Sequence, residues 1–366
     1  MSKVRLIKIV GVALLVFIAV FLIGYTLLKL TGDKELEKTH YPQTEIIKNE
    51  ESDNEINMLL LGYGGKGHSG GSLADVIILL NINNKEKKAN LISIPRDLWV
   101  EIPLRSDHKE YFKINTAHAI GLDDKAYPMK EHLFQGKLGG GHLTKQVVKD
   151  ATNFSIDYFV SINFGNFVNA IDSLNGIEVN VPNGFEDRFY PVKGLEEESC
   201  GFSPEKIVEI HEKHTGFDLE KQFECRYETL SFNKGLNHMD GATTLKFVRS
   251  RHSDTQGNDF ARSERQMAVL EGIKNKLLSL EAIENYSEFI DQYEGMITTD
   301  FDFRATQSLI DFVGNVEEYE IKQIILNKDN VLKESVSSQG AYILIPKEGI
   351  RNYGGIQEYI SNQTKN

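Results

Sequence analysis

The chain has 366 residues, of which 40% are hydrophobic and 26% charged, and these proportions are typical of a globular protein with a core of its own. Its 41 Lys and Arg residues against 53 Asp and Glu residues give a formal net charge of -12 at pH 7. Proteins that bind nucleic acid present a basic face to the phosphates, so this balance argues against a nucleic acid as partner.

An apolar run of twenty residues, 9–28, stands near the N-terminus. As a helix it would span about 30 Å, the thickness of a bilayer core. Lys3, Arg5 and Lys8 precede it, which favours a cytoplasmic N-terminus and an outer location for the rest. The alternative is a signal peptide, but the run is long for one and no Ala-x-Ala site follows. We therefore predict a single-pass anchor in the cell membrane over residues 1–30.

A polar, charge-rich segment follows at residues 31–55 and is typical of a linker. Beyond it, at 56–366, we expect one extracytoplasmic domain. Apolar runs predict strands at 56–62, 76–82, 89–94, 153–164, 177–181, 319–326 and 340–345. Helices are predicted at 165–174 and 262–282. This alternation indicates an α/β fold with a mixed sheet.

The segment 184–232 has a different, charge-rich character and contains both cysteines of the chain, Cys200 and Cys225. We interpret it as an insertion with short helices of its own. In an exported domain the two cysteines can form a disulfide, which would stabilise the fold by about 3 kcal/mol on the chain-entropy model. Two free thiols are the alternative.

Four arginines lie within seventeen residues of this acidic chain: Arg249, Arg251, Arg262 and Arg265. Guanidinium groups repel one another, so gathering them is costly unless an anion lies between them, and their planar forks match phosphate geometry. The cluster therefore predicts a phosphate or pyrophosphate site. The alternative is a solvated network of ion pairs with the acidic residues Asp254, Asp259 and Glu264.

Other polar residues stand at the ends of predicted strands. Asp75 precedes an apolar strand and is either a loop cap or a ligand for a hard cation such as Mg²⁺. Arg96 and Asp97 follow Pro95 at the end of another strand, where α/β folds place ligands, although a surface ion pair is the plainer interpretation.

Two further motifs have ordinary interpretations. In the segment 113–119, Lys113 and Asn115 precede His118, and a lone histidine is more often structural than catalytic. The segment 62–67 matches G-x-G-x-x-G, but a strand and not a helix follows, so it is no dinucleotide site. It indicates either a glycine-rich lid or a surface turn.

Taken in order over about residues 56–278, these segments resemble the LytR-CpsA-Psr family of membrane-anchored cell-wall enzymes. The resemblance is carried by 57–62 (NMLLLG), 75–78 (DVII), 93–97 (SIPRD), 113–118 (KINTAH), 175–182 (NGIEVNVP) and 240–266, which runs from DGA through FVRSR to RSERQ.

The resemblance implies a mixed α/β sheet flanked by helices. It also implies a phosphotransferase that moves a glycopolymer from a polyprenyl-pyrophosphate carrier to peptidoglycan, with Mg²⁺ or Mn²⁺ as cofactor and membrane lipid as a further partner. Asp75 would hold the metal. The catalytic residues would be Asp75, Arg96, Arg249 and Arg251. The pyrophosphate would be bound by Arg96, Lys113, Asn115, Arg249, Arg251, Arg262 and Gln266.

The chain departs from the family pattern at two places. Gly64 stands where the family often has an acidic residue, and 72–74 (SLA) lacks an arginine that often precedes the Asp75 position. Compared with the family pattern, the chain therefore lacks one acidic residue that could bind the metal and one arginine that could contact the phosphate.

The proton acceptor for the attacking hydroxyl would be Asp75, Asp97 or Asp259. The alternative functions are a lipid pyrophosphate hydrolase, also conceivable as a side activity, and a non-catalytic regulator that binds polyprenyl phosphate.

Overall fold

The computed structural model describes residues 54–66, 70–253, 255–257, 259–278, 297–301, 303–314 and 318–365. The predicted anchor at 1–30 and nearly all of the predicted linker at 31–55 lie outside these ranges. Within them, no helix combines the length and the apolar character that crossing a bilayer requires.

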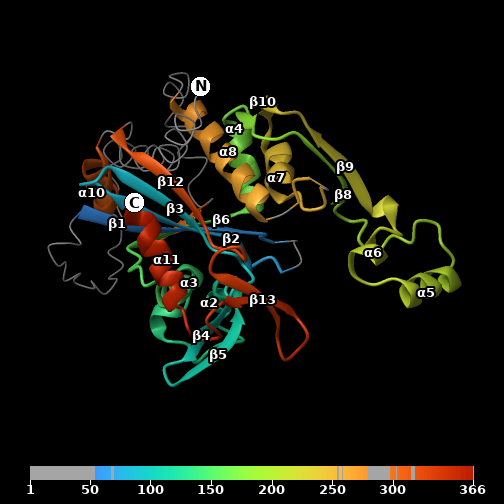
Figure 1. The fold of residues 1–366 in the computed structure, drawn as a ribbon, viewed down its shortest axis with the longest axis horizontal. Helices are drawn as coiled ribbons and strands as arrows, with labels where there is room; N and C mark the ends of the chain where they lie inside the picture. Colours follow the sequence, from blue (N-terminus) through green and yellow to red (C-terminus); the bar gives the residue numbers. More distant parts are fainter. Residues whose placement is uncertain are drawn as a thin grey trace, which may run out of the picture.

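A mixed sheet of six strands forms the centre of the fold (Figure 1). Neighbouring strands are parallel in the pairs β1–β6 and β3–β12 and antiparallel elsewhere, so the prediction of a mixed sheet is confirmed. Its strands, in spatial order, are β11 (Ile297–Thr299), β6 (Tyr158–Asn163), β1 (Glu55–Tyr63), β2 (Ala74–Asn83), β3 (Lys88–Ser93) and β12 (Glu320–Ile325).

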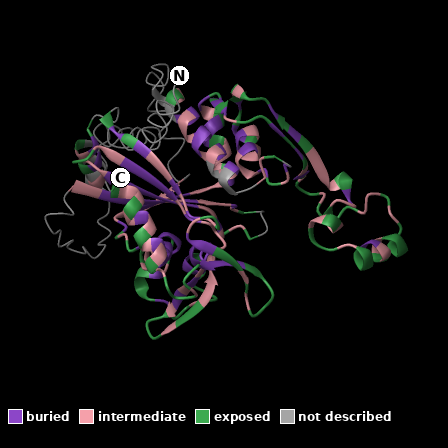
Figure 2. Cartoon of the chain, viewed as in Figure 1, coloured by how far each residue is buried: buried purple, intermediate pink, exposed green. Residues whose placement is uncertain are grey.

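Both faces of this sheet are buried, and the alternation of side chains along β2 shows why (Figure 2). Ile77 and Leu79 enter a core on one face, whereas Ile78 and Leu80 enter a core on the other. Continuous apolar strands of this kind need a layer on each side. Helices therefore cover both faces, and the prediction of a sheet flanked by helices is confirmed.

The first face is covered by helices and two hairpins. They are α2 (Thr116–Leu122), α3 (Gly139–Thr152), α11 (Gly354–Lys365), the hairpin of β4 (Trp99–Arg105) and β5 (His108–Lys113), and the hairpin of β13 (Leu332–Val336) and β14 (Tyr342–Pro346). A short 3-10 helix, η2 (His132–Phe134), lies between α2 and α3. Helix α3 lies so close to the sheet that a Cβ on Gly141 would be 2.1 Å from the Phe159 ring.

The second face is covered by α8 (Asp259–Leu278) and α10 (Phe303–Val313). Helix α8 also packs against a smaller unit that has its own core. That unit contains α4 (Phe164–Ser173), β7 (Ile177–Val181), β10 (Gly235–Met239) and α7 (Gly241–Arg249).

The predicted strand at 153–164 is only half right. Helix α3 runs to Thr152, and Asn153 ends it with a left-handed backbone at φ 64°, so the strand begins at Tyr158. Asparagine tolerates this conformation better than most residues with a side chain. The apolar pattern of 153–157 reflects packing of a loop under the sheet and not a strand.

The insertion forms an arm that extends away from the sheet (Figure 1). Its base is a hairpin of β8 (Phe185–Pro191) and β9 (Tyr227–Phe232). The short helices α5 (Pro204–Lys213) and α6 (Gly216–Glu220) and the 3-10 turn η3 (Glu224–Arg226) lie beyond it. A disulfide joins Cys200 to Cys225, with their Cα atoms 5.6 Å apart. Of the two alternatives for the cysteines, the structure has the disulfide.

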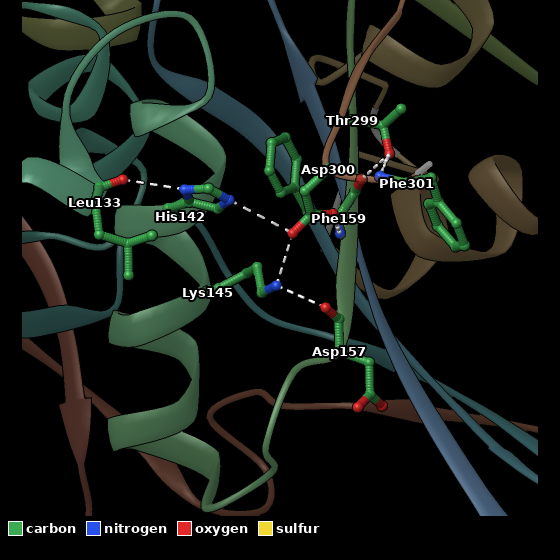
Figure 3. A network of polar contacts seen from close by, with 8 residues as sticks. All are labelled: Leu133, His142, Lys145, Asp157, Phe159, Thr299, Asp300 and Phe301. Carbon is green, nitrogen blue, oxygen red and sulfur yellow. Dashed lines mark hydrogen bonds and ion pairs between the residues drawn. The ribbon is translucent and has the colours of Figure 1, made fainter. Parts of the chain in front are cut away.

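A buried polar network ties the sheet to α3 (Figure 3). The Asp300 carboxylate accepts hydrogen bonds from the Lys145 ammonium at 2.7 Å and from the backbone N–H of Phe159 at 2.8 Å. His142 lies 3.6 Å from the same carboxylate. Burial by itself raises the pKa of Asp300, but the His142 and Lys145 side chains and the Phe159 amide outweigh it, so the pKa lies below its usual value.

We predict that Asp300→Ala lowers the free energy of unfolding by about 2 kcal/mol, because it leaves the half-buried Lys145 ammonium without its carboxylate. Urea denaturation at neutral pH measures this loss. Because the pKa of Asp300 is lowered in the fold, the carboxylate stabilises above about pH 4, and its contribution disappears as the pH falls below that value. The control is Asp150→Ala, which removes a more exposed ion pair; an equal loss there would contradict the prediction.

Candidate functional site

The predicted site residues Asp75 and Arg96 lie near one end of the central sheet. Tyr63 at the end of β1 pairs with Asn163 of β6 and with Ala74 of β2. The amide of Ile94, just after β3, donates to the carbonyl of Ile77. The loops that follow β1, β3 and β6 therefore converge around the start of β2, where Asp75 stands.

Carboxylates and cations alternate in a short chain at this end. The Arg96 guanidinium forms an ion pair with Asp75 through Nη1 and Oδ1. Its Nε lies 3.6 Å from Oδ2 of Asp97, and Asp97 accepts a hydrogen bond of 2.6 Å from the Lys113 ammonium. These four side chains are between 22% and 29% exposed, so a ligand can reach them. Arg96 is thus more than the surface pair with Asp97 that its sequence context suggested.

Asn115 holds the two loops of this network together through its backbone. Its N–H donates to the carbonyl of Arg96 at 3.3 Å, and its own carbonyl accepts from the N–H of Ala74 at 3.1 Å. Only 5% of Asn115 is exposed. The residue therefore fixes the spacing between Arg96 and Asp75, whatever its side chain contacts in a complex.

His118 is a structural residue, as its sequence context suggested. One ring nitrogen lies 2.8 Å from the carbonyl of Ser72, and the other lies 3.0 Å from the hydroxyl of Ser161. Burial lowers the pKa of His118, and the hydrogen bond to Ser72 opposes that shift only in part. The neutral ring thereby attaches the loop before Asp75 to β6.

Arg249 approaches the same end of the sheet from α7, which belongs to the smaller unit. It is the last residue of α7, and its guanidinium lies 5.0 Å from the centre of the Phe164 ring. Phe164 follows β6, and its ring would be 3.9 Å from a Cβ on Gly62 of β1. Burial raises the pKa of the Tyr190 phenol, and the charge of Arg249, which also hydrogen-bonds to it, works against this rise.

The turn after α7 is organised by a buried carboxylate that the sequence analysis did not identify. Asp187 of β8 is fully buried. Its Oδ2 accepts hydrogen bonds from the Ser250 hydroxyl at 2.6 Å and from the backbone N–H groups of Arg251 and His252, each at 3.1 Å. The signal in the sequence was slight, because Asp187 lies among five other charged or aromatic residues of β8. Arg249 is the last residue of the helix, and Arg251 lies two residues beyond it.

Arg265, the fourth arginine of the cluster, holds the other side of this turn. It is 2% exposed and donates to the carbonyls of Ser250 and Gln256, each at 2.6 Å. Burial, together with repulsion by Arg262, lowers the pKa of Arg265 to about 10. The hydrogen bonds of its guanidinium thus go to backbone carbonyls. Arg262 and Gln266 lie one turn apart on α8.

The insertion also touches this turn. The Phe217 ring of α6 stacks on the His252 ring, with the ring centres 4.2 Å apart and the planes inclined by 17°. His252 additionally lies 3.0 Å from the carbonyl of Phe189 in β8. The arm is therefore part of the support for the backbone that carries Arg251, a role that composition alone did not suggest.

The predicted residues thus form two groups. Asp75, Arg96, Lys113 and Asn115 belong to the network at the sheet end, whereas Arg251, Arg262 and Gln266 belong to the turn and to α8. Arg249 lies at the Phe164 ring and at Tyr190.

Few side chains at this site are arranged to coordinate a divalent cation. Within the described ranges, no group of three or more His, Cys, Asp or Glu side chains is arranged to hold a metal ion. Asp75 and Asp97 do lie on either side of Arg96. Mg²⁺ is commonly bound by one or two carboxylates together with phosphate oxygens of a substrate, so these residues fit such an ion only when a phosphate completes the set.

Comparison with known proteins gives a consistent result. The model of the LytR_cpsA_psr family matches residues 24–352. The polyisoprenyl-teichoic acid–peptidoglycan teichoic acid transferase TagU of Enterococcus faecalis is 26% identical over 340 residues, which are 90% of this chain and 91% of the relative. TagT of Bacillus subtilis, which carries the same activity name, is 26% identical over 273 residues, 74% of this chain and 67% of the relative.

Two solved structures have the same fold. The protein gbs0355 from Streptococcus agalactiae aligns with a TM-score of 0.57 at 19% identity and covers 86% of this chain and 89% of its own. A structure titled "TagT bound to LIIa-WTA" aligns with a TM-score of 0.53 at 22% identity, over 91% and 100% of the two chains. At these identities the likeness supports the fold alone.

His118 makes a prediction for the pH dependence of stability. Its pKa is lowered in the fold, so the unfolded chain takes up the proton first as the pH falls below about 6.5. The free energy of unfolding should therefore fall between about pH 6.5 and 5, and His118→Gln should make that fall smaller. Urea denaturation across this range measures it. An unchanged slope would contradict the prediction, and the exposed His132→Gln is the control.

Asp187 makes a second prediction. Asp187→Ala removes the acceptor for three hydrogen bonds of the turn and should lower the free energy of unfolding by about 3 kcal/mol. Hydrogen exchange should accelerate at the amides of Arg251 and His252. The exposed neighbour Glu186→Ala is the matched control. Unaltered exchange at both amides would show that Asp187 does not hold the turn.

Proposed function

The chain belongs to the LytR_cpsA_psr family, as its motifs predicted, and on this premise we propose that it transfers a glycopolymer from a polyprenyl-pyrophosphate carrier to peptidoglycan. The relatives TagU and TagT are named for the transfer of teichoic acid from a polyisoprenyl-linked form to peptidoglycan. We propose the same class of reaction here. The product is a phosphodiester between the polymer and a hydroxyl of the acceptor.

The single observation that carries this proposal is the alternating chain Asp75–Arg96–Asp97–Lys113 at the sheet end. Arg249 lies against the ring of Phe164, which follows β6 at this end of the sheet. Phosphoryl transfer depends mainly on alignment and on neutralising charge, so an accessible array of cations suits it. Arg96, Lys113, Asn115 and Arg249 would contact the pyrophosphate from the sheet end. Arg251, Arg262 and Gln266 would contact it from the turn and α8.

In the proposed reaction the acceptor hydroxyl attacks the phosphorus next to the sugar. The new P–O bond forms as the bond from that phosphorus to the bridging oxygen breaks, and the lipid leaves as its monophosphate. Arg96 and Arg249 stabilise the negative charge that develops on the leaving phosphate. The hydroxyl proton passes to a carboxylate, and Asp75 and Asp97 are the candidates at this end of the sheet.

The proposal includes Mg²⁺ or Mn²⁺, held by Asp75 together with the substrate phosphates. Such an ion supplies additional neutralisation of the pyrophosphate when bound. Because Asp75 pairs with Arg96 in the structure, a cation on Asp75 would leave the Arg96 guanidinium available to the phosphate. We also propose that residues 9–28 anchor the chain in the cell membrane, with the domain on the outer side, where the lipid carrier and peptidoglycan meet.

The test is a transfer assay with the full-length chain, a polyprenyl-pyrophosphate glycan, Mg²⁺ and a peptidoglycan acceptor. We expect polymer linked to the acceptor. Arg249→Ala and Arg249→Lys should each reduce the rate roughly a hundredfold or more, because an ammonium does not reproduce the planar fork of a guanidinium.

The exposed Arg105→Ala is the matched control and should transfer normally. Release of phosphorylated glycan without linkage would identify a hydrolase instead. Binding of the lipid without any product would identify a regulator. Normal transfer by Arg249→Ala would contradict the assignment of the site.

A further inference from the structure

A second polar site lies at the other end of the central sheet. A cavity of about 370 Å³ opens there, which is within the range of small-molecule sites. Strand β1 runs from Glu55 at this cavity to Tyr63 at the Asp75 end, so the two sites are separated by roughly 26 Å at about 3.3 Å per residue. The cavity is therefore not part of the arginine site.

Its floor is a row of three buried asparagines on adjacent strands. Asn57, Asn81 and Asn90 are 9%, 2% and 2% exposed, and they stand opposite one another in the register of β1, β2 and β3. Asn90 donates to Asn81 at 3.1 Å, and Asn81 donates to Asn57 at 2.9 Å. The amides are thus held in fixed orientations before any ligand arrives.

This row interrupts an otherwise apolar face. Toward the other end of the sheet the same face presents Leu59, Leu79 and Ile92, which belong to the core. Burying amides costs free energy even when they are hydrogen-bonded to one another, and leucine at these positions would continue the core at less cost. The side chains change from apolar to amide at the point where the cavity opens. We infer that the amides serve the cavity and not the packing of the core.

The rim provides the remaining groups of a sugar site. The rim contains hydroxyls, further amides, two carboxylates and one ammonium group. The half-buried Phe154 adds an aromatic surface. The rim residues are Glu55, Asn83, Glu86, Thr152, Asn153, Phe154, Ser155, Gln357, Ser361, Thr364 and Lys365.

The charges of this lining exclude some ligands. Glu86 pairs with Lys88 at 3.2 Å and Glu55 balances Lys365, so the lining has no excess positive charge to attract an anion. Oriented amides and hydroxyls offer both donors and acceptors, which suits a neutral ligand that is rich in hydroxyl and amide groups. An aromatic ring can in addition cover the apolar face of a sugar ring.

We propose that this cavity is a binding site for an uncharged saccharide of the N-acetylhexosamine class. Its acetamido group pairs with the asparagine amides, and its hydroxyls pair with the rim. The further assignment of this saccharide to the glycan strand of the peptidoglycan acceptor rests on the proposed function, whereas the binding itself does not. The site would hold the acceptor at a distance from the reacting hydroxyl.

The test is a calorimetric titration of the full-length protein, in a detergent without a sugar headgroup, with chitotriose, a soluble oligomer of N-acetylglucosamine. We expect saturable binding. N-acetylglucosamine 6-phosphate should bind no more tightly than N-acetylglucosamine itself, because the lining has no excess positive charge. The double variant Asn81→Leu/Asn90→Leu should bind at least roughly tenfold more weakly. It also leaves the Asn57 Oδ1 without its donor from Asn81, so circular dichroism must show that this variant is folded.

A second double variant, Gln357→Ala/Ser361→Ala, changes only the rim on α11 and guards against misfolding of the first. It should also weaken binding. Asn180→Leu, at an exposed strand position of β7, is the matched control and should bind normally. Arg249→Ala should bind chitotriose normally too, so that failure of transfer and failure of this site can be told apart.

Absence of binding at millimolar chitotriose would overturn the proposal. So would undiminished binding by both double variants, or tighter binding of the phosphorylated sugar.

Discussion

Neutralisation of clustered guanidinium groups is the constraint on which the proposed site depends. Each arginine that the fold brings close to another needs a negative partner or a set of carbonyls, because buried like charges repel strongly. Arg96 lies between Asp75 and Asp97, and Arg265 lies between the carbonyls of Ser250 and Gln256. These contacts fix the loops from which the other cations project.

The supports of the site come from parts of the chain that are distant in sequence. Asn115 links the loops of Arg96 and Asp75, and His118 links the loop before Asp75 to β6. Asp187 and Phe217 of the insertion support the turn that carries Arg251. The insertion is thus attached to the site through its base and through α6, while α5 extends into solvent (Figure 2). A disulfide within the arm closes the segment that ends next to β9.

The two faces of the central sheet are buried, whereas its two ends carry polar groups that a ligand can reach. Apolar side chains fill both faces along the middle of β1, β2 and β3. At one end the strands lead into charged loops, and at the other the core gives way to a row of amides over a cavity. In the proposed reaction the protein holds two large substrates, and a polar site at each end of the sheet would separate them without a second domain.

Local patterns predicted much of this organisation. The strands at 56–62, 76–82 and 89–94 and the helices at 165–174 and 262–282 follow from apolar periodicity. Their counterparts are β1, β2, β3, α4 and α8, and the predicted residues 279–282 lie outside the described ranges. Helix α3 and the hairpin of β4 and β5 were missed, because α3 begins with three glycines and the hairpin alternates only weakly. The sequence analysis identified Asp75 and Arg96 because they stand at the ends of predicted strands. No such pattern distinguishes Asp187, so it was not identified.

The sequence by itself determined the family, the mixed α/β class, and the residue types of a phosphate site, because these depend on local periodicity and on motif spacing. Only the tertiary structure decided which arginine binds which partner. Arg265 and Arg262 are three residues apart on one helix, yet Arg265 is buried against carbonyls that precede the helix. Which charge is compensated within the fold, and which remains for a ligand, depends on long-range packing that no local pattern encodes.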